Sequence, residues 1–145
     1  MKLESDHRIY ELRSSELWGP PFWDFLYLTA LGFPVTLSAT QQSEFARLLK
    51  TFHLFLPCAE CRFHYSKMIK DINTDVKTRD EAFTIVRNIH NKIRKRLKKN
   101  EFLPNDIVAH FYTLKKRQVQ MKWIKHYTVP IVCALVILLI FLRWK

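Results

Sequence analysis

The chain has 145 residues, of which about the last twenty form an apolar tail, so the remainder is long enough for one compact domain. Its composition is 48% hydrophobic and 14% aromatic, which argues against intrinsic disorder. Two glycines are too few for a fold with many tight turns or for a glycine-rich phosphate loop, so an all-α domain is favoured.

The positive charge is concentrated near the C-terminus. The formal net charge is +11, of which residues 1–112 contribute +4 and residues 113–145 contribute +7 without a single acidic residue. Because this excess lies beside an apolar segment, membrane lipid is a better partner than DNA. We expect no nucleic-acid partner.

The first predicted helix covers residues 18–33. Pro20 and Pro21 suit its first turn, and Pro34 should end it. The apolar and aromatic residues that follow the prolines have helical spacing.

A second helix is predicted from about residue 41 to residue 56, capped by Ser38 or Thr40. Its apolar residues form one stripe, which we expect to be core: Phe45, Leu48, Leu49, Phe52 and Phe55.

A third helix should begin at Cys58 and reach about Ile72. Thr78 and Glu81 then form a capping box that starts a fourth helix. One side of this helix is apolar, with Phe83, Val86, Ile89, His90, Ile93 and Leu97. Pro104 and Asn105 begin a last helix.

The last helix runs through a basic stretch into the apolar run YTVPIVCALVILLIFL. With Trp123 and Trp144 as interfacial anchors, this run is long enough to span a membrane. A buried core helix is the alternative. We predict one compact helical domain at residues 1–113, a basic linker at 114–126 and a single-pass tail anchor at 127–143. The domain should face the cytosol because the segment before the anchor is basic.

Cys58 and Cys61 carry the clearest chemical signal. A CxxC at a helix N-terminus favours a redox-active disulfide, because unpaired N–H groups and the helix dipole stabilise a thiolate. Zinc bound by the two cysteines and His64 is an alternative, but it needs a further ligand. A thioredoxin-like fold is another, but it needs strands that the flanking helical patterns do not provide.

Three segments in order resemble the Erv/ALR sulfhydryl oxidases. WGPPFWDFLY resembles the opening motif of that family, LPCAECRFHY its redox segment in viral members, and IHNKIRKRLKK its flavin helix. Together they cover roughly residues 18–111, and the trio is far more specific than a CxxC alone.

The resemblance implies a four-helix bundle that binds FAD, with a short fifth helix followed here by the transmembrane helix. It implies that Cys58 and Cys61 are catalytic, with Cys61 nearer the flavin. Tyr27 stands where the family usually has histidine, and Arg94 where it has a second asparagine. The cofactor-binding residues implied in this way are Gly19, Trp23, Tyr27, His64, His90, Asn91, Arg94, Arg96 and Lys99.

The function implied is an FAD-dependent sulfhydryl oxidase that forms disulfides in protein thiols and passes electrons through Cys58 and Cys61 to FAD and then to oxygen, giving hydrogen peroxide. The chain has no second CxxC, so its substrate should be a protein that presents a dithiol, such as a small thioredoxin-like carrier. The resemblance also implies a homodimer and a viral protein that virions incorporate.

Two other functions stay open at this point. A tail-anchored helical adaptor would hold a structural zinc at the CxxC and have no activity. A nucleic-acid binder would use the basic stretch of residues 92–99.

Overall fold

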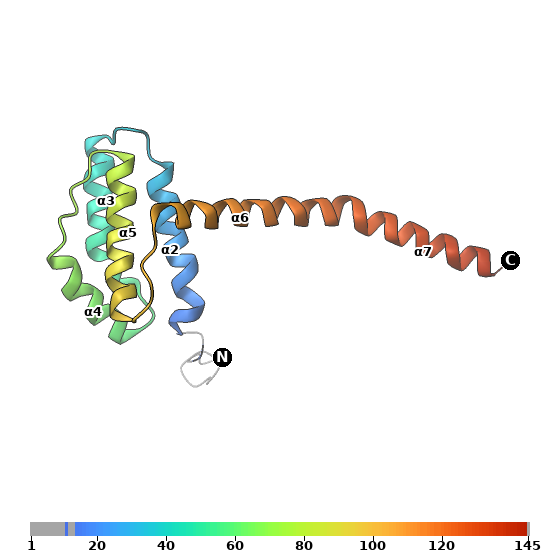
Figure 1. The fold of residues 1–145 in the computed structure, drawn as a ribbon, viewed down its shortest axis with the longest axis horizontal. Helices are drawn as coiled ribbons and strands as arrows, with labels where there is room; N and C mark the ends of the chain where they lie inside the picture. The colour runs from blue at the N-terminus through green and yellow to red at the C-terminus, as the bar shows by residue number, and fades with distance from the viewer. Residues whose placement is uncertain (1–10, 12–13, 145) are drawn as a thin grey trace, which may run out of the picture. The chain divides into compact units, whose positions relative to one another are not determined.

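The computed structural model describes residue 11 and residues 14–144. This part of the chain is helical and contains no strand, which confirms the predicted all-α class. It divides into two compact units, one ending at Glu101 and one covering Phe102–Lys145. In the first unit, α2 packs against α5, and α3 packs against α4 (Figure 1).

Helix α2 spans Ser15–Gly32, so it begins earlier than predicted. Ser14 caps it, and its hydroxyl accepts the Glu16 N–H at 3.3 Å. Pro20 and Pro21 therefore lie in the second turn instead of the first, where each removes a backbone donor. The helix ends before Pro34, as predicted.

Helix α3 spans Ala39–Thr51 and is capped by Ser38 in a capping box with Gln41. A 3₁₀ turn, η2, follows at Phe52–Phe55, so the prediction of one helix as far as Leu56 is wrong. Each residue of a 3₁₀ turn rotates the chain by about 120° instead of about 100°. Phe55 consequently leaves the apolar stripe and is 78% exposed, which contradicts its predicted place in the core.

Helix α4 spans Ala59–Lys70 and starts at its N-cap, Cys58. The hydroxyl of Tyr65 donates to the backbone oxygen of Leu49 at 3.0 Å and joins α4 to α3. The buried core of this unit is made mainly of aliphatic and aromatic residues: Leu26, Tyr27, Ala30, Leu37, Phe45, Leu49, Phe52, Leu56, Tyr65, Ile69, Val76, Ala82, Ile85, Val86 and Ile89.

Helix α5 spans Arg79–Arg96 and begins with the predicted capping box of Thr78 and Glu81. Lys98 follows in the left-handed region at φ 56°. This conformation lets the Lys99 N–H reach the Arg94 backbone oxygen at 2.9 Å, which closes a Schellman-type end. Leu97 is exposed, although the predicted apolar stripe included it.

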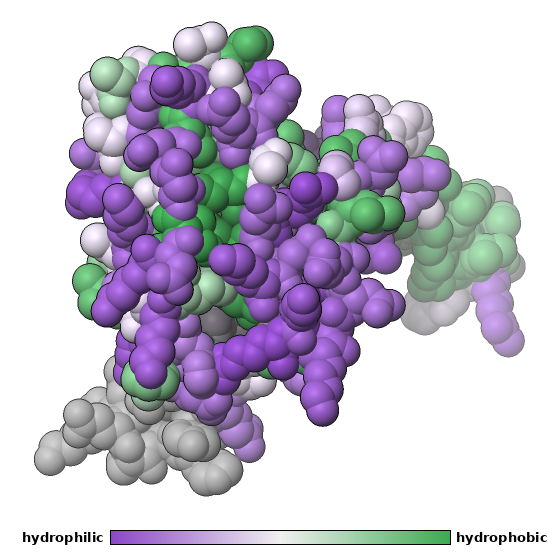
Figure 2. All heavy atoms as spheres, turned by 60° about the vertical axis from the view of Figure 1, so that its left-hand side comes forward, coloured by the Kyte–Doolittle hydropathy of each residue, from purple (hydrophilic) through white to green (hydrophobic). Residues whose placement is uncertain are grey.

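The second unit is one continuous helix made of α6 (Pro104–Trp123), the π-helical turn η3 (Ile124–Thr128) and α7 (Val129–Arg143). The π turn comes just before Pro130, which lacks an N–H and crowds the preceding turn. The helix is long and apolar enough to cross a membrane, and its most apolar stretch is not buried in the protein. Figure 2 shows the side chains of this apolar segment in green.

Candidate active site

Cys58 and Cys61 form a disulfide at the N-terminus of α4, with 5.1 Å between their Cα atoms. Both residues are half-buried. The Cys58 Sγ accepts the backbone N–H of Cys61 at 3.1 Å, so Cys58 takes the position of the helix cap. After reduction, the same N–H and the helix dipole would stabilise a thiolate on Cys58.

The segment before the disulfide is fixed by contacts on both sides. The ring of Phe52 stacks on Phe22 of α2, with 3.6 Å between ring centroids. The Arg62 Nη1 donates to the Leu56 backbone oxygen at 2.6 Å. Helix α2 therefore holds the turn that leads into Cys58. The residue that follows Phe22 on α2 is Trp23.

Trp23 and Tyr27 of α2 meet His90 of α5. The Trp23 and His90 rings are parallel within 3°, with 4.1 Å between centroids. The Tyr27 hydroxyl and the His90 Nδ1 share a hydrogen bond of 3.1 Å. Three of the residues implied by the resemblance thus form one cluster, in which Tyr27 is 3% and His90 is 9% exposed.

This cluster is neutral at physiological pH. Burial, together with a smaller effect of the nearby charge of Arg94, lowers the pKa of His90 to about 4. Burial also raises the pKa of Tyr27, against a smaller opposing effect of Arg87 and Arg94. An uncharged imidazole and a protonated phenol leave the pair able to stack on an aromatic ligand without a net charge.

Arg87 is a residue that the sequence analysis missed. Its Nε is buried and has no hydrogen-bond partner among the described residues. Arg87, His90, Asn91 and Arg94 are spaced at i, i+3, i+4 and i+7, which places them on one face of α5. This spacing could have identified Arg87 from the sequence, because Arg87 lies one turn before His90 on the helix face of the predicted cofactor-binding residues.

His64 and Arg96 meet at Glu60, which lies between the two cysteines in sequence. The Glu60 Oε1 is 3.1 Å from Arg96 Nη2 and 3.4 Å from His64 Nε2. These side chains are exposed to solvent, so each pair contributes at most about 1 kcal/mol. The Glu60–Arg96 pair nevertheless links the start of α4 to the end of α5. Lys99, just beyond α5, is exposed.

Gly19 is buried on α2, yet apart from its chain neighbours and the nearby backbone of its own helix, no heavy atom lies within 4 Å of the place that a Cβ would occupy. Its backbone does not need glycine, because its φ is not positive. Glycine within a helix costs about 1 kcal/mol relative to alanine. The ligand-free packing therefore gives no reason for glycine here, and the space beside it is open to a bound group.

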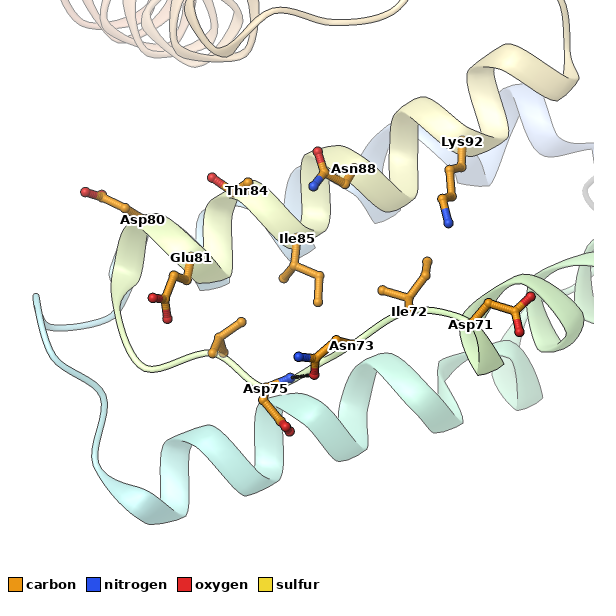
Figure 3. A pocket seen from close by; sticks show the side chains of 11 residues that line it. Asp71, Ile72, Asn73, Asp75, Asp80, Glu81, Thr84, Ile85, Asn88 and Lys92 are labelled. Carbon is orange, nitrogen blue, oxygen red and sulfur yellow. Dashed lines mark hydrogen bonds between the residues drawn. The ribbon is translucent and has the colours of Figure 1, made fainter.

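A separate groove of about 430 Å³ lies between α5 and the segment that follows α4 (Figure 3). Asp71, Asp75, Asp80 and Glu81 make much of its lining acidic. None of the predicted site residues lines it. In the described part of the chain, no three His, Cys, Asp or Glu residues are grouped to hold a metal ion, so the zinc alternative gains no support.

The comparison with known families settles the classification. A sequence model of the Erv1 / Alr family matches residues 20–124. This chain belongs to the Erv1 / Alr family. The matched region contains the disulfide, the cluster of Trp23, Tyr27 and His90, and all of α5.

Relatives within the Erv1 / Alr family are similar in sequence and fold. The mitochondrial FAD-linked sulfhydryl oxidase ERV1 of Saccharomyces cerevisiae is 29% identical over 87 residues, which are 60% of this chain and 46% of that protein. The FAD-linked sulfhydryl oxidase of African swine fever virus (isolate Tick/Malawi/Lil 20-1/1983) is 34% identical over 83 residues, which are 57% and 69%. The chain thus spans between about half and about two thirds of these relatives.

The crystal structure of the yeast Erv1 core superposes with a TM-score of 0.60 and 28% identity, covering 65% of this chain and 80% of that one. The solved relative thus confirms the predicted Erv-type helical fold.

His90 makes the stability of this Erv1 / Alr chain depend on pH. The unfolded imidazole takes up a proton near pH 6.5 and the folded one near pH 4, so between these values the unfolded state binds more protons. Stability therefore falls as the pH drops from 7 to 4, by roughly 2 to 3 kcal/mol from this residue. Urea unfolding followed by tryptophan fluorescence, without added flavin, measures it in wild type and in His90→Gln.

Glutamine at position 90 cannot titrate, so the stability difference between wild type and variant should grow in favour of wild type as the pH rises to 7. A difference that stays constant from pH 4 to pH 7 would contradict a buried neutral His90.

Proposed function

We propose that this chain is an FAD-dependent sulfhydryl oxidase that forms disulfide bonds in protein thiols. The observation that carries the proposal is the Cys58–Cys61 disulfide at the N-terminus of α4, held by α2 in a chain of the Erv1 / Alr family. The names of the yeast and viral relatives, both FAD-linked sulfhydryl oxidases, support the same activity and cofactor.

The residues present fit FAD. The flat pair of Trp23 and His90 offers aromatic surface to a planar ring system, and the open space beside Gly19 leaves room for it. The Arg87 Nε has no hydrogen-bond partner among the described residues and could donate to an anionic oxygen of the FAD pyrophosphate. Asn91, Arg94, Arg96 and Lys99 would add polar and cationic groups along the same end of α5.

The two cysteines would have different roles. A substrate thiolate attacks Cys58 Sγ, the Cys58–Cys61 bond breaks, and Cys61 leaves as a thiolate. A second substrate thiolate then attacks the substrate sulfur of this mixed disulfide and displaces Cys58 as a thiolate. The N–H of Cys61 and the start of α4 stabilise that leaving thiolate, which favours release of the oxidised substrate.

Bound FAD would accept the electron pair of the dithiol and pass it to oxygen, which yields hydrogen peroxide. The protein's part is to keep the cysteines in position at the cap of α4 and to keep His90 uncharged. The CxxC is the one cysteine pair in the sequence, since Cys133 lies alone in the apolar run of α7. We therefore propose a protein dithiol as substrate, such as a small thioredoxin-like carrier. We also propose that nucleic acid is not a partner.

The C-terminal helix would anchor the enzyme to a membrane. From Trp123 to Trp144 a helix rises about 30 Å, which matches the hydrocarbon thickness of a bilayer. Lys115, Lys116 and Arg117 precede it, so the catalytic unit would face the cytosol. The African swine fever virus relative supports a viral protein. That virions carry the protein is part of the proposal. Protection of the catalytic unit from protease added outside sealed cells checks the orientation, and its digestion would contradict it.

A homodimer would use the exposed apolar side of α2. Leu17, Phe25 and Leu28 are each more than half exposed and lie on one side of this helix. A monomer in sedimentation of the chain in detergent would contradict this assembly.

Loss of Cys61 should uncouple thiols from the flavin. The purified chain in detergent, loaded with FAD, should show a flavin band near about 450 nm that added dithiol bleaches without oxygen. We expect Cys61→Ser to retain the band, and we expect its flavin to be bleached at least about a hundredfold more slowly than that of the wild type. Cys133→Ser is the matched control and should behave like wild type. Wild type that binds no FAD, or a Cys61→Ser protein that bleaches as fast as wild type, would contradict the proposal.

Removal of the Arg87 guanidinium should weaken FAD binding. Arg87→Met keeps the length and apolar stem of the side chain, and we expect about a tenfold increase in Kd for FAD, or about 1.4 kcal/mol. Fluorescence titration of FAD into the protein measures this without reference to activity.

Lys92→Met on the exposed side of the same helix is the control and should not change Kd. Equal affinities of wild type and Arg87→Met would exclude Arg87 from the cofactor site.

A further inference from the structure

Three large apolar side chains that lie close to the disulfide in sequence are exposed. Leu54 and Phe55 at the end of η2 are 63% and 78% exposed, and Phe63 on α4 is 53% exposed. They lie within five residues of a cysteine on both sides of the CxxC. We call these three residues the apolar collar.

The folding of the bundle does not use the collar. Phe52 and Leu56 take the buried positions on either side of Leu54 and Phe55, so these two face outward. On α4, Tyr65 and Ile69 form the buried side. The Phe63 ring contacts the edge of His64 at 5.4 Å and the Lys67 Nζ at 4.2 Å, which leaves it on the outer surface.

Reaction at Cys58 brings a partner chain close to the collar. A disulfide holds the two Cα atoms about 4.4 to 6.8 Å apart, so the partner chain must approach Cys58 that closely. Phe55 is three residues before Cys58, at most about 11 Å along the chain. Phe63 is five residues beyond Cys58, a rise of about 7.5 Å along α4. A polypeptide that reacts at Cys58 therefore comes within reach of both side chains, whereas a small thiol is not extended enough to contact them.

We propose that the collar is a docking surface for a protein substrate whose dithiol is flanked by large apolar side chains. This inference rests on the oxidase function proposed above, and it names the class of substrate. A second copy of the chain or a lipid surface seated on the collar would also cover the half-buried disulfide and block it, which favours the substrate as occupant.

The docked reaction balances within the two chains. One substrate sulfur bonds to Cys58 Sγ as the Cys58–Cys61 bond breaks, and the second substrate sulfur then replaces Cys58. The substrate dithiol loses two electrons and two protons and becomes a disulfide. The Cys58–Cys61 pair gains them and becomes a dithiol.

The test uses the full chain in detergent, loaded with FAD, and three probes. Two are synthetic peptides with the same CxxC, flanked in one by leucine and phenylalanine and in the other by serine. The third is dithiothreitol, which is too small to contact the collar while it is bonded to Cys58. We expect the wild type to oxidise the apolar peptide with a kcat/KM about tenfold above that of the serine peptide.

The variants Leu54→Ser with Phe55→Ser, and separately Phe63→Ser, should remove most of this preference. Turnover of dithiothreitol and of the serine peptide should stay within about twofold, because the exposed side chains support neither the core nor the disulfide. Val35→Ser is the matched control, since Val35 is 71% exposed and lies in the α2–α3 connection, and it should keep the preference.

Equal kcat/KM values for the two peptides in the wild type would overturn the inference while dithiothreitol turnover still upholds the oxidase. A variant that slows all three probes alike, or that converts a dimer to a monomer, would also overturn it, because the collar would then serve the fold or the assembly. A wild type that oxidises none of the probes would overturn the oxidase function, and the inference with it.

Discussion

The contact between α2 and α5 determines where the reactive groups of this protein lie. Trp23 lies flat on His90, and Tyr27 shares a hydrogen bond with the same imidazole in a buried setting. Water is largely excluded there, so His90 remains uncharged and the two helices meet through neutral aromatic surfaces. The neighbouring Phe22 stacks on Phe52 and so extends the influence of α2 to the turn before Cys58. One helix therefore positions both the aromatic cluster and the disulfide.

The start of α4 shows how local stability and chemistry compete. Helices are best capped by Ser, Thr, Asp or Asn, as α3 and α5 are by Ser38 and Thr78. At α4 the cap is Cys58, whose sulfur is a weak acceptor, and replacing a good cap typically costs about 1 kcal/mol. The same position gives Cys58 the N–H donor and the helix dipole that stabilise a thiolate. The cap is weaker but Cys58 is a better leaving group, which is consistent with a reactive disulfide. The exposed apolar residues of η2 beside it likewise do not contribute to the stability of the core.

Local signals in the sequence predicted much of the fold. The candidate N-cap at Ser38, the capping box at Thr78 and the proline at position 104 locate three helix starts, because each depends on residues a few positions apart. The exposure of Phe55 was not predictable in this way, since it follows from the 3₁₀ turn at Phe52–Phe55, whose first ring stacks on Phe22 far away in the sequence. Motif resemblance led to Trp23, Tyr27 and His90, but Arg87 required a view of which polar atoms remain unpartnered. The assignment of these residues to a cofactor site stays a prediction.

The central claim is that the Cys58–Cys61 disulfide and a bound FAD can each accept one electron pair, and that the reduced cysteines pass theirs to the FAD. Anaerobic titration of the FAD-loaded full chain with a dithiol, followed by the flavin absorbance, tests it most directly. The account predicts that the wild type consumes about two equivalents of dithiol per chain before the flavin is fully bleached, whereas Cys58→Ser accepts about one. A wild type that saturates at one equivalent, as the variant does, would contradict it.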